Sequence, residues 1–354
     1  MRIIVMGTGP FAVPTCERLL AEGHEIPLVV TRPLPEPPPK KLPPRPVFDW
    51  ANSSGFDVFE PVSINAPEAI EKLAEFDADL FFVCDYGQIL SNQCLQAAKL
   101  GGINLHGSLL PRHRGAAPVQ WTLLAGDEVA GITVIHMTPK LDAGPCLSQV
   151  DTPVEANETA EELEPRLARL GVDATLSAIE KLKNWDEEES LGIIQEKSEV
   201  TRAPRFQKSD GQLDFRRSAD YLARLVKACQ PWPGTFAELQ WESGKKLRVI
   251  VRRADAQPLH ASVLVQSGAW TNDELLHASQ EPSACGRAFS IDVEGQGKCI
   301  AATTGDGVLI IRSIQPSGKR AMDTAEFLRG HPLNDKVSFL LPEIERQELS
   351  PNRK

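Results

Sequence analysis

The chain contains 354 residues, of which 42% are apolar and 24% are charged. This composition excludes collagen, a coiled coil and global disorder, and the length predicts about two globular domains. No apolar run reaches the roughly 18 residues that a membrane-spanning helix requires, and the apolar start at Met1–Gly7 is too short for a secretory signal. We therefore expect a cytoplasmic protein without membrane contact. The seven cysteines form no CxxC pair and their number is odd, which argues against a disulfide framework and against a zinc site.

The net charge of −10 is unevenly distributed along the chain. Residues 1–202 carry a net charge of −13, whereas residues 203–354 carry +3. An acidic chain usually has no nucleic-acid partner, but a basic C-terminal part can still present a local surface to phosphates. Charge alone therefore leaves the partner open.

Short apolar strands alternate with amphipathic helices in the first half of the chain. The expected strands are residues 3–6, 25–31, 58–59, 80–84, 102–106 and 131–137, and the expected helices include 11–22, 47–54 and 67–75. This alternation predicts an α/β fold with a Rossmann-like, doubly wound and mostly parallel sheet. A long amphipathic helix at 158–184, expected to be interrupted at Pro165 and Gly171, closes this domain.

A proline-rich segment follows the second expected strand. Eight of the 15 residues from 32 to 46 are prolines. Proline fixes its own backbone angle and donates no backbone hydrogen bond, so the segment cannot form a helix or an inner strand. We expect a stiff, exposed loop with polyproline character.

The periodicity changes in the second half of the chain. A helix at 221–229 is followed by short strands, expected at 236–240, 247–253, 262–266, 288–293, 298–303 and 307–313. Many short strands in about 110 residues predict a small, OB-like β-barrel. The expected organisation is a Rossmann-like domain at 1–190, a linker at 191–207 and an OB-like domain at 208–354.

A glycine motif near the start, Gly7-Thr-Gly9-Pro-Phe-Ala12, matches the dinucleotide-binding pattern between a strand and a helix. That pattern also requires an acidic residue at the end of the second strand to hold the ribose. Here the second strand ends at Thr31-Arg32, and Pro10 removes one N–H from the anion-binding turn. A structural turn is therefore the favoured interpretation, and a nicotinamide cofactor is not expected.

A second group of polar residues is more informative. Asn104 and His106 are two residues apart on one strand, so both side chains point to the same face. They lie at the carboxyl end of the strand, where open α/β sheets build their sites. Asp142 is expected in another loop that follows a strand, at the same edge of the sheet. An amide, an imidazole and a carboxylate can together support acyl transfer without a protein nucleophile.

The pattern around these residues resembles the signature of the 10-formyltetrahydrofolate-dependent formyltransferases. The resemblance covers nearly the whole chain, and within this family it is strongest to the members that formylate methionyl-tRNA. The segments that carry it are 102–120, Gly126-Asp127, Leu141-Asp-Ala-Gly144, Phe11-Ala-Val-Pro14, Tyr86-Gly-Gln-Ile-Leu90, Ala203-Pro-Arg205, Asp210-Gly-Gln-Leu-Asp214, Pro231-Trp-Pro-Gly-Thr-Phe236, Gln315-Pro-Ser-Gly-Lys-Arg320 and Phe327-Leu-Arg-Gly330.

The resemblance implies an enzyme that transfers a formyl group from 10-formyltetrahydrofolate to the α-amine of methionyl-initiator tRNA. It implies that Asn104 and His106 stabilise the oxyanion and that Asp142 holds the imidazole charged and positioned. It also implies a monomer that needs no metal. The residues that it places against the folate are Tyr86, Gly87, Gln88, Ile89, Leu90, Ser108, Leu109, Leu110 and Pro111.

The sequence departs from the family pattern at three places. The basic loop thought to reach the tRNA is proline-rich here and retains Lys40, Lys41 and Arg45 as expected tRNA contacts. Asp85 replaces a small residue beside the folate cleft. His113 replaces an aromatic residue, and we expect it to serve packing or to be solvated.

Three alternatives stay open at this point. An enzyme with the same fold can hydrolyse 10-formyltetrahydrofolate or formylate another amine. The proline-rich loop, which departs from the family pattern, leaves this alternative open. A non-catalytic RNA-binding protein is disfavoured by the presence of Asn104, His106 and Asp142 together. A nicotinamide oxidoreductase lacks its ribose-binding acid.

Overall fold

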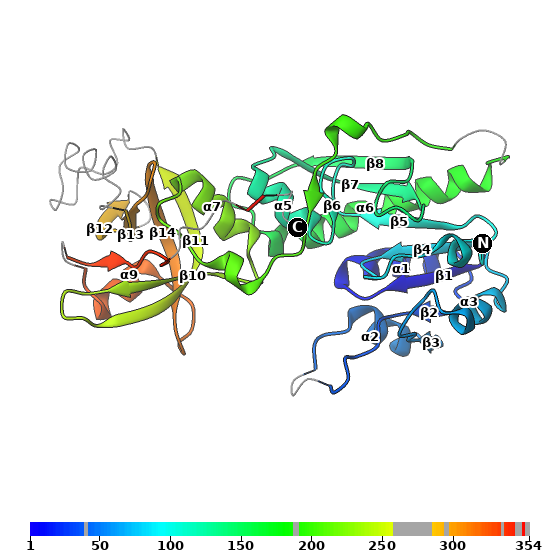
Figure 1. Cartoon of the computed structure of the whole chain (residues 1–354), viewed down its shortest axis with the longest axis horizontal. Helices are drawn as coiled ribbons and strands as arrows, with labels where there is room; N and C mark the ends of the chain where they lie inside the picture. Colours follow the sequence, from blue (N-terminus) through cyan, green and yellow to red (C-terminus); the bar gives the residue numbers. More distant parts are fainter. Residues whose placement is uncertain are drawn as a thin grey trace.

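Two sheets, one toward each end of an elongated molecule, organise the chain (Figure 1). The computed structural model describes residues 1–38, 42–186, 191–257, 285–293, 297–333, 336–343 and 349–350. The N-terminal part places helices on both faces of its sheet, whereas the C-terminal part is mainly strands. No helix in the described ranges is both long and apolar enough to cross a membrane.

The N-terminal sheet has seven strands in the order β3-β2-β1-β4-β5-β7-β8. Their bounds are β1 (Ile3–Gly7), β2 (Val29–Val30), β3 (Val58–Phe59), β4 (Leu80–Cys84), β5 (Gly102–His106), β7 (Val129–His136) and β8 (Cys146–Pro153). The first five pair in parallel, and β7 and β8 add in antiparallel fashion. The predicted mostly parallel sheet is confirmed. Strand β8, in which exposed and partly buried residues alternate, is not among the strands that the sequence predicts.

Alternate residues of β1 pack on opposite faces of this sheet, as a doubly wound fold requires. Ile3 and Val5 join a cluster with Leu19 of α1, whereas Ile4 and Met6 face a second cluster. The helices are η1 (Pro10–Ala12), α1 (Val13–Ala21), α2 (Pro46–Ser53), α3 (Pro67–Ala74), α4 (Asn92–Leu95), α5 (Pro118–Ala125) and α6 (Ala160–Lys183). Burial on both faces fixes the strand ends on which the site is built.

Helix α6 is continuous, so the predicted interruption at Pro165 and Gly171 is wrong. A capping box between Thr159 and Glu162 starts the helix. Pro165 lies in the second turn, where it removes one intrahelical hydrogen bond. Gly171 instead allows close packing on the sheet, because a Cβ built there would lie 2.8 Å from Cδ2 of Leu105 on β5.

The C-terminal sheet is antiparallel, with the order β12-β13-β14-β11-β10-β16. Its elements are β10 (Thr235–Gln240), β11 (Lys246–Gln257), β12 (Ala288–Val293), β13 (Gly297–Thr303), β14 (Val308–Pro316), β15 (Met322–Asp323) and β16 (Ser338–Phe339), with α7 (Ala219–Ala228) and α9 (Thr324–Gly330) beside them. The predicted smaller domain of short strands is confirmed. In the described residues its edges meet at one bridge, Arg287 with Ser338, so it is a curled sheet and not a fully laddered barrel. The strand expected at 262–266 lies outside the described residues.

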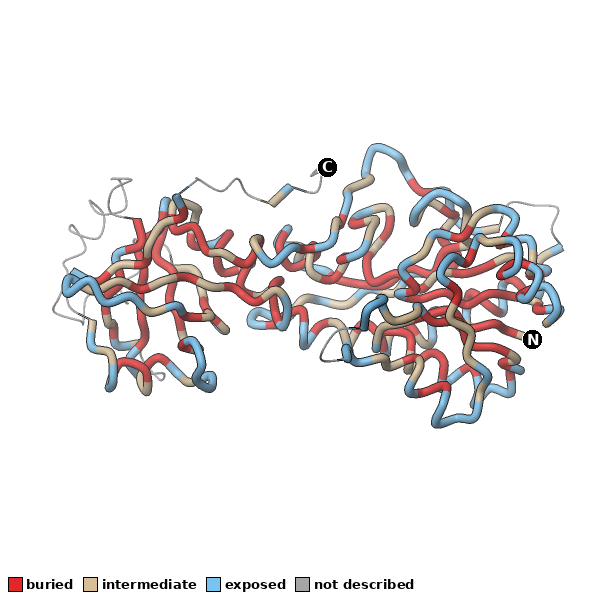
Figure 2. Tube along the Cα trace, turned by 60° about the horizontal axis from the view of Figure 1, so that its bottom comes forward, coloured by how far each residue is buried: buried red, intermediate tan, exposed pale blue. Residues whose placement is uncertain are grey.

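The two parts share a continuous apolar core at their junction. One buried cluster extends from β1 through Trp121 of α5 and Leu222 of α7 to Val249 of β11. Buried residues accordingly run through both parts in Figure 2. Helix α7 also contacts α5 through Arg224, whose Nε donates a 3.0 Å hydrogen bond to the Leu124 carbonyl. The C-terminal sheet is therefore docked against the first domain.

The contact between α6 and β5 gives the first prediction. Gly171→Leu forces a side chain into the space of Leu105, and overpacking of this kind costs about 1–3 kcal/mol. We expect the free energy of unfolding in urea to fall by that amount. Asp173→Leu, on the exposed side of the same helix, is the control and should change it by less than about 0.5 kcal/mol. Equal effects of the two substitutions would contradict this packing.

Candidate active site

A cavity of about 540 Å³ opens beside the carboxyl ends of β1, β4 and β5. Asn104, His106 and Asp142 all line it, as does the whole segment 86–90 that follows β4. The structure thus brings the predicted catalytic trio together with five of the nine predicted folate contacts. Two exposed apolar side chains, Ile89 (54% exposed) and Leu141 (54% exposed), lie in the cavity wall. Exposed apolar groups in a concave site offer a binding surface to a flat or apolar ligand.

The predicted segment 108–111 does not line this cavity. It forms a turn in which Ser108 and Leu110 are buried, and the Ser108 hydroxyl donates a 2.7 Å hydrogen bond to the Arg112 carbonyl. The Leu110 N–H donates to the Thr133 hydroxyl at 3.0 Å, and the Leu110 side chain is buried against Ile135. In the structure this segment therefore supports the strand ends.

The His106 ring is held by the backbone of a neighbouring loop. Only 5% of this residue is exposed, and its Nε2 lies 2.9 Å from the carbonyl oxygen of His113. A carbonyl only accepts hydrogen bonds, so Nε2 carries a proton and donates it. Nδ1 lies 3.8 Å from Oδ2 of Asp142, which is an ion-pair distance and too long for a hydrogen bond. A proton on Nδ1 would therefore be stabilised by the carboxylate while remaining free to contact a substrate oxygen.

Asp142 reaches His106 by a route different from the one predicted. Strand β7 runs antiparallel to β5, so its end at His136 lies beside Ile103 and away from His106. The expectation that Asp142 simply follows a strand at the same edge is therefore wrong. The loop 137–145 folds back over the sheet instead, and Oδ2 of Asp142 accepts a 2.9 Å hydrogen bond from the Gly115 N–H. This path requires glycine at position 144, where a Cβ would lie 1.8 Å from the His136 carbonyl oxygen.

The segment 191–207, expected to be only a linker, contributes directly to the site. Its strand β9 (Arg202–Ala203) pairs in parallel with β6 (Arg114–Gly115) next to the cavity. Thr201 accepts a 2.8 Å hydrogen bond from the backbone N–H of His113, and Gln195 contacts the Asp142 loop. The composition of this segment gave no indication of these contacts, because they depend on tertiary pairing.

His113 is buried, which fits the packing role and not the solvated one, and its ring contacts a carboxylate. Its Nε2 lies 2.6 Å from Oδ2 of Asp127, and Arg112 contacts the other oxygen of the same carboxylate at 2.5 Å. His113 adopts a left-handed backbone conformation with φ of 59°. Its ring therefore anchors the loop, while its carbonyl orients His106.

Arg45, the expected tRNA contact that the structure describes, does not line this cavity. Arg45 forms an ion pair with Glu60, and its guanidinium lies 3.7 Å from the centre of the Phe48 ring. These contacts fold the side chain back onto its own domain. Lys40 and Lys41 lie outside the described residues.

Two further carboxylates, Asp85 and Glu164, line the same cavity. Desolvation raises the pKa of Asp85, and the charge of nearby His106 opposes this shift. Desolvation, followed by the charge of Asp85, raises the pKa of Glu164 to about 7.

All seven cysteines are buried and free, and burial raises the pKa of the neighbouring Cys84 thiol. In the part of the chain that the structure describes, no group of three or more His, Cys, Asp or Glu side chains could hold a metal ion.

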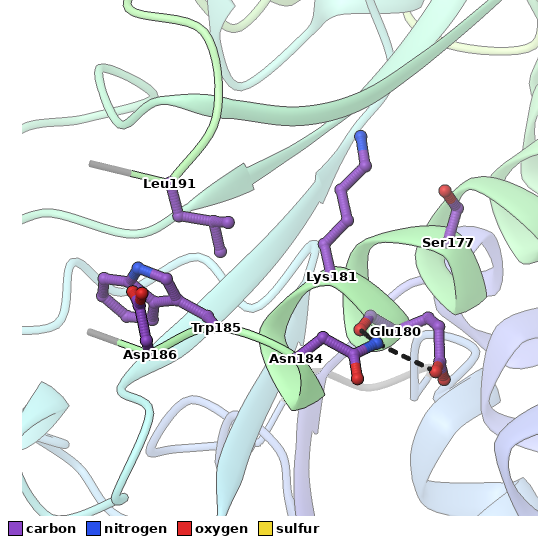
Figure 3. Close-up of a pocket in the computed structure, with 7 residues that line it drawn as sticks. All are labelled: Ser177, Glu180, Lys181, Asn184, Trp185, Asp186 and Leu191. Carbon is purple, nitrogen blue, oxygen red and sulfur yellow. Dashed lines mark hydrogen bonds between the residues drawn. The ribbon is translucent and has the colours of Figure 1, made fainter. Parts of the chain in front are cut away.

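A second depression, of about 640 Å³, lies at the end of α6 (Figure 3). It is lined by Ser177, Glu180, Lys181, Asn184, Trp185, Asp186 and Leu191. Lys181 donates a 2.5 Å hydrogen bond to the Leu147 carbonyl, and Asn184 donates to the Glu180 carbonyl at 2.9 Å. None of the predicted site residues lies here.

The raised pKa of Glu164 predicts a pH-dependent stability. Between about pH 4.5 and 7 the Glu164 carboxyl keeps its proton in the folded chain and loses it in the unfolded chain. The free energy of unfolding of the wild type therefore falls as the pH rises from about 4.5 through 7. The side chain introduced by Glu164→Gln stays neutral and has no such pH dependence. The free energy of unfolding of the variant minus that of the wild type should therefore rise by about 1–2 kcal/mol between pH 5 and pH 8. Urea unfolding at several pH values measures this, with exposed Glu161→Gln on the same helix as the control. A difference that is constant with pH would contradict the shift.

The comparisons with known proteins agree with this geometry. A model of the formyl transferase family matches residues 1–179, and a model of the formyl transferase C-terminal domain matches residues 205–332. The methionyl-tRNA formyltransferase of Rhodopirellula baltica is 42% identical over 353 residues, which cover 97% of each chain. That of Novosphingobium aromaticivorans is 38% identical over 335 residues, covering 94% of this chain and 98% of its own.

Solved structures share the fold at low sequence identity. An N-formyltransferase from Helicobacter canadensis, in complex with folinic acid and dTDP-3-aminofucose, has a TM-score of 0.57 and 15% identity and covers 87% of this chain and 97% of its own. HypX from Aquifex aeolicus, in complex with tetrahydrofolic acid, has a TM-score of 0.53 and 14% identity and covers 93% of this chain and 47% of its own. The structural likeness shows the fold, and the sequence relatives show the family. The chain belongs to the formyl transferase family and, within it, to the methionyl-tRNA formyltransferases.

Proposed function

We propose that this protein transfers the formyl group of 10-formyltetrahydrofolate to the α-amine of methionyl-initiator tRNA. The observation that carries the proposal is the meeting of Asn104, His106 and Asp142 in one cavity. It is supported by relatives of nearly equal length that bear the name of this activity. The protein would act in the cytoplasm, as a monomer and without a metal ion.

The reaction needs no covalent enzyme intermediate. The amine nitrogen forms a bond to the formyl carbon, the bond from that carbon to N10 of the folate breaks, and the proton that the amine loses balances the proton that N10 gains. Negative charge develops on the formyl oxygen during this exchange. The protein therefore has to place hydrogen-bond donors at that oxygen and move one proton.

We assign the donor role to Asn104 and His106. Both side chains point from the same face of β5 into the cavity. The Nε2–H of His106 is already engaged by the His113 carbonyl, so Nδ1 is the ring nitrogen available to the substrate. Asp142, 3.8 Å from Nδ1, stabilises a proton there and thus keeps the imidazole a donor.

The cavity has the size and character that the folate requires. Its volume of about 540 Å³ falls within the range usual for small-ligand sites. The segment 86–90 supplies one wall, and the exposed Ile89 and Leu141 supply apolar surface for the flat pterin ring. We assign the predicted residues 108–111 to supporting β7, where Leu110 contacts Thr133 and Ile135.

The tRNA would contact both domains, for which we retain the bounds 1–190 and 208–354. The positive net charge of residues 203–354 suits sequence-independent contact with RNA phosphates. Lys40, Lys41 and Arg45 are the proposed contacts of the first domain. Of these, Arg45 is expected to contribute least to the salt dependence, because its ion pair with Glu60 already neutralises its charge.

Removal of a catalytic group tests the assignment directly. His106→Ala and Asp142→Asn should each lower kcat by at least about 100-fold, as loss of an oxyanion donor or its support does. Steady-state formation of formylmethionyl-tRNA measures this, and an unchanged melting temperature confirms that the variants are folded. Rates within about threefold of wild type would remove the mechanism.

The basic loop gives a separate prediction for tRNA binding. Each Lys–phosphate contact contributes about 0.7–0.9 to the slope of log affinity against log salt concentration. A Lys40→Ala, Lys41→Ala double variant should therefore reduce that slope by about 1.5 in a filter-binding titration. Arg45→Ala is the comparison and should change the slope by less than about 0.5, because Arg45 is already paired with Glu60. Equal effects of the two variants would contradict this division of roles.

A further inference from the structure

Gln195 lies on the segment that joins the two domains, and its side chain is buried, with 7% of the residue exposed. Its Nε2 donates hydrogen bonds to two backbone carbonyls of the β7–β8 loop, those of Asp142 at 2.9 Å and Gly144 at 2.7 Å. Its Oε1 accepts from Nε of Arg114 at 3.0 Å and from Nη2 at 2.7 Å. Two donors and two acceptor positions are all that a carboxamide has, so every one of them is used.

The orientation of this amide is fixed by its partners. Arg114 can only donate and the two carbonyls can only accept, so a flipped amide would place like groups against each other at all four contacts. The contacts also join parts of the chain that are far apart in sequence, by 51 to 81 residues. Gln195 therefore connects the Asp142 loop to the Arg114–Gly115 strand with one defined geometry.

The Asp142 loop needs such support. Asp142 adopts a left-handed backbone conformation with φ of 48°, which a residue other than glycine holds only where its surroundings enforce it. The outer part of the loop, at Lys140 and Leu141, is exposed to solvent. The carboxylate itself is held by the Gly115 N–H, and Gly115 is the neighbour of Arg114. Both ends of the Asp142–Gly115 contact are thus anchored through Gln195.

The adjoining chain strengthens this connection. Cys146 and Ile193 exchange two backbone hydrogen bonds, of 2.8 and 2.9 Å, at the end of the same loop. On the other side of Gln195, β9 pairs with β6 at Arg114 and Gly115. The Gln195 backbone is therefore held on both sides while its side chain reaches the loop.

We propose that Gln195 is a positioning residue for formyl transfer, which sets the place of the Asp142 carboxylate relative to the His106 ring. Gln195 does not line the cavity and acts only through the backbone of the loop and the guanidinium of Arg114. This inference rests on the proposed function, because it assumes that Asp142 supports catalysis. A displacement of about 1 Å in a catalytic group can cost roughly 100-fold in rate.

The test compares Gln195 variants in two backgrounds. Gln195→Met keeps the volume of the side chain but makes none of its hydrogen bonds, and Gln195→Glu keeps the acceptors for Arg114 but loses the donors to the loop. In the wild-type background both should lower kcat by about 10- to 100-fold and change the KM for the folate by less than about threefold. In an Asp142→Asn background the same substitutions should slow the enzyme by less than about threefold, because their target is already lost.

A control variant and the pattern of outcomes distinguish failure of the Gln195 inference from failure of the proposed function. Glu196→Ala, on the same segment, removes hydrogen bonds to Ser198 and none to the loop, and should leave kcat within about twofold of wild type. Equal slowing by the Gln195 variants in both backgrounds would mean that Gln195 acts by general destabilisation, and would overturn the inference alone. Normal kcat in the Gln195 variants would also overturn it. Normal kcat in Asp142→Asn itself would overturn the proposed mechanism.

Discussion

The approach of the Asp142 carboxylate to the His106 ring is the contact on which this site depends. His106 is fixed by its strand and by the carbonyl of His113, but Asp142 comes from a loop whose strand ends at the opposite edge of the sheet. The loop has to fold back across the sheet to bring the two within 3.8 Å. Glycine at position 144, the Gly115 N–H and the Gln195 amide together make that path possible.

The same arrangement explains why rigid and irregular elements both contribute to the site. Strands β1, β4 and β5 are buried on both faces and give the cavity a floor that does not shift. Of the four non-glycine residues with left-handed backbone in the described chain, three lie in loops around that floor, namely Asp85, His113 and Asp142. Backbone strain of this kind persists where neighbouring groups enforce it, and hydrogen bonds from the segment 191–207 do so at His113 and Asp142. The segment between the domains is therefore part of the active site.

Much of this could be predicted from the sequence, because the signals are local. The strand β5 with Asn104 and His106 on one face and the strand-rich second domain follow from periodicity, and the cavity segment 86–90 follows from the resemblance to the family. The antiparallel direction of β7, the continuity of α6 through Gly171 and the role of Gln195 could not, since each depends on contacts between residues far apart in sequence. The predicted interruption at Gly171 is wrong because a glycine that breaks a helix and one that permits close packing look alike in a sequence.

The measurement that tests the central claim most directly is release of tetrahydrofolate from 10-formyltetrahydrofolate, with and without methionyl-initiator tRNA. The account predicts release only when the charged tRNA is present, with the formyl group recovered on the amine of methionine in equal amount. Release of the same size without tRNA, with formate as the product, would contradict it and make the cavity that of a hydrolase. No release under either condition would contradict the proposed role of Asn104, His106 and Asp142.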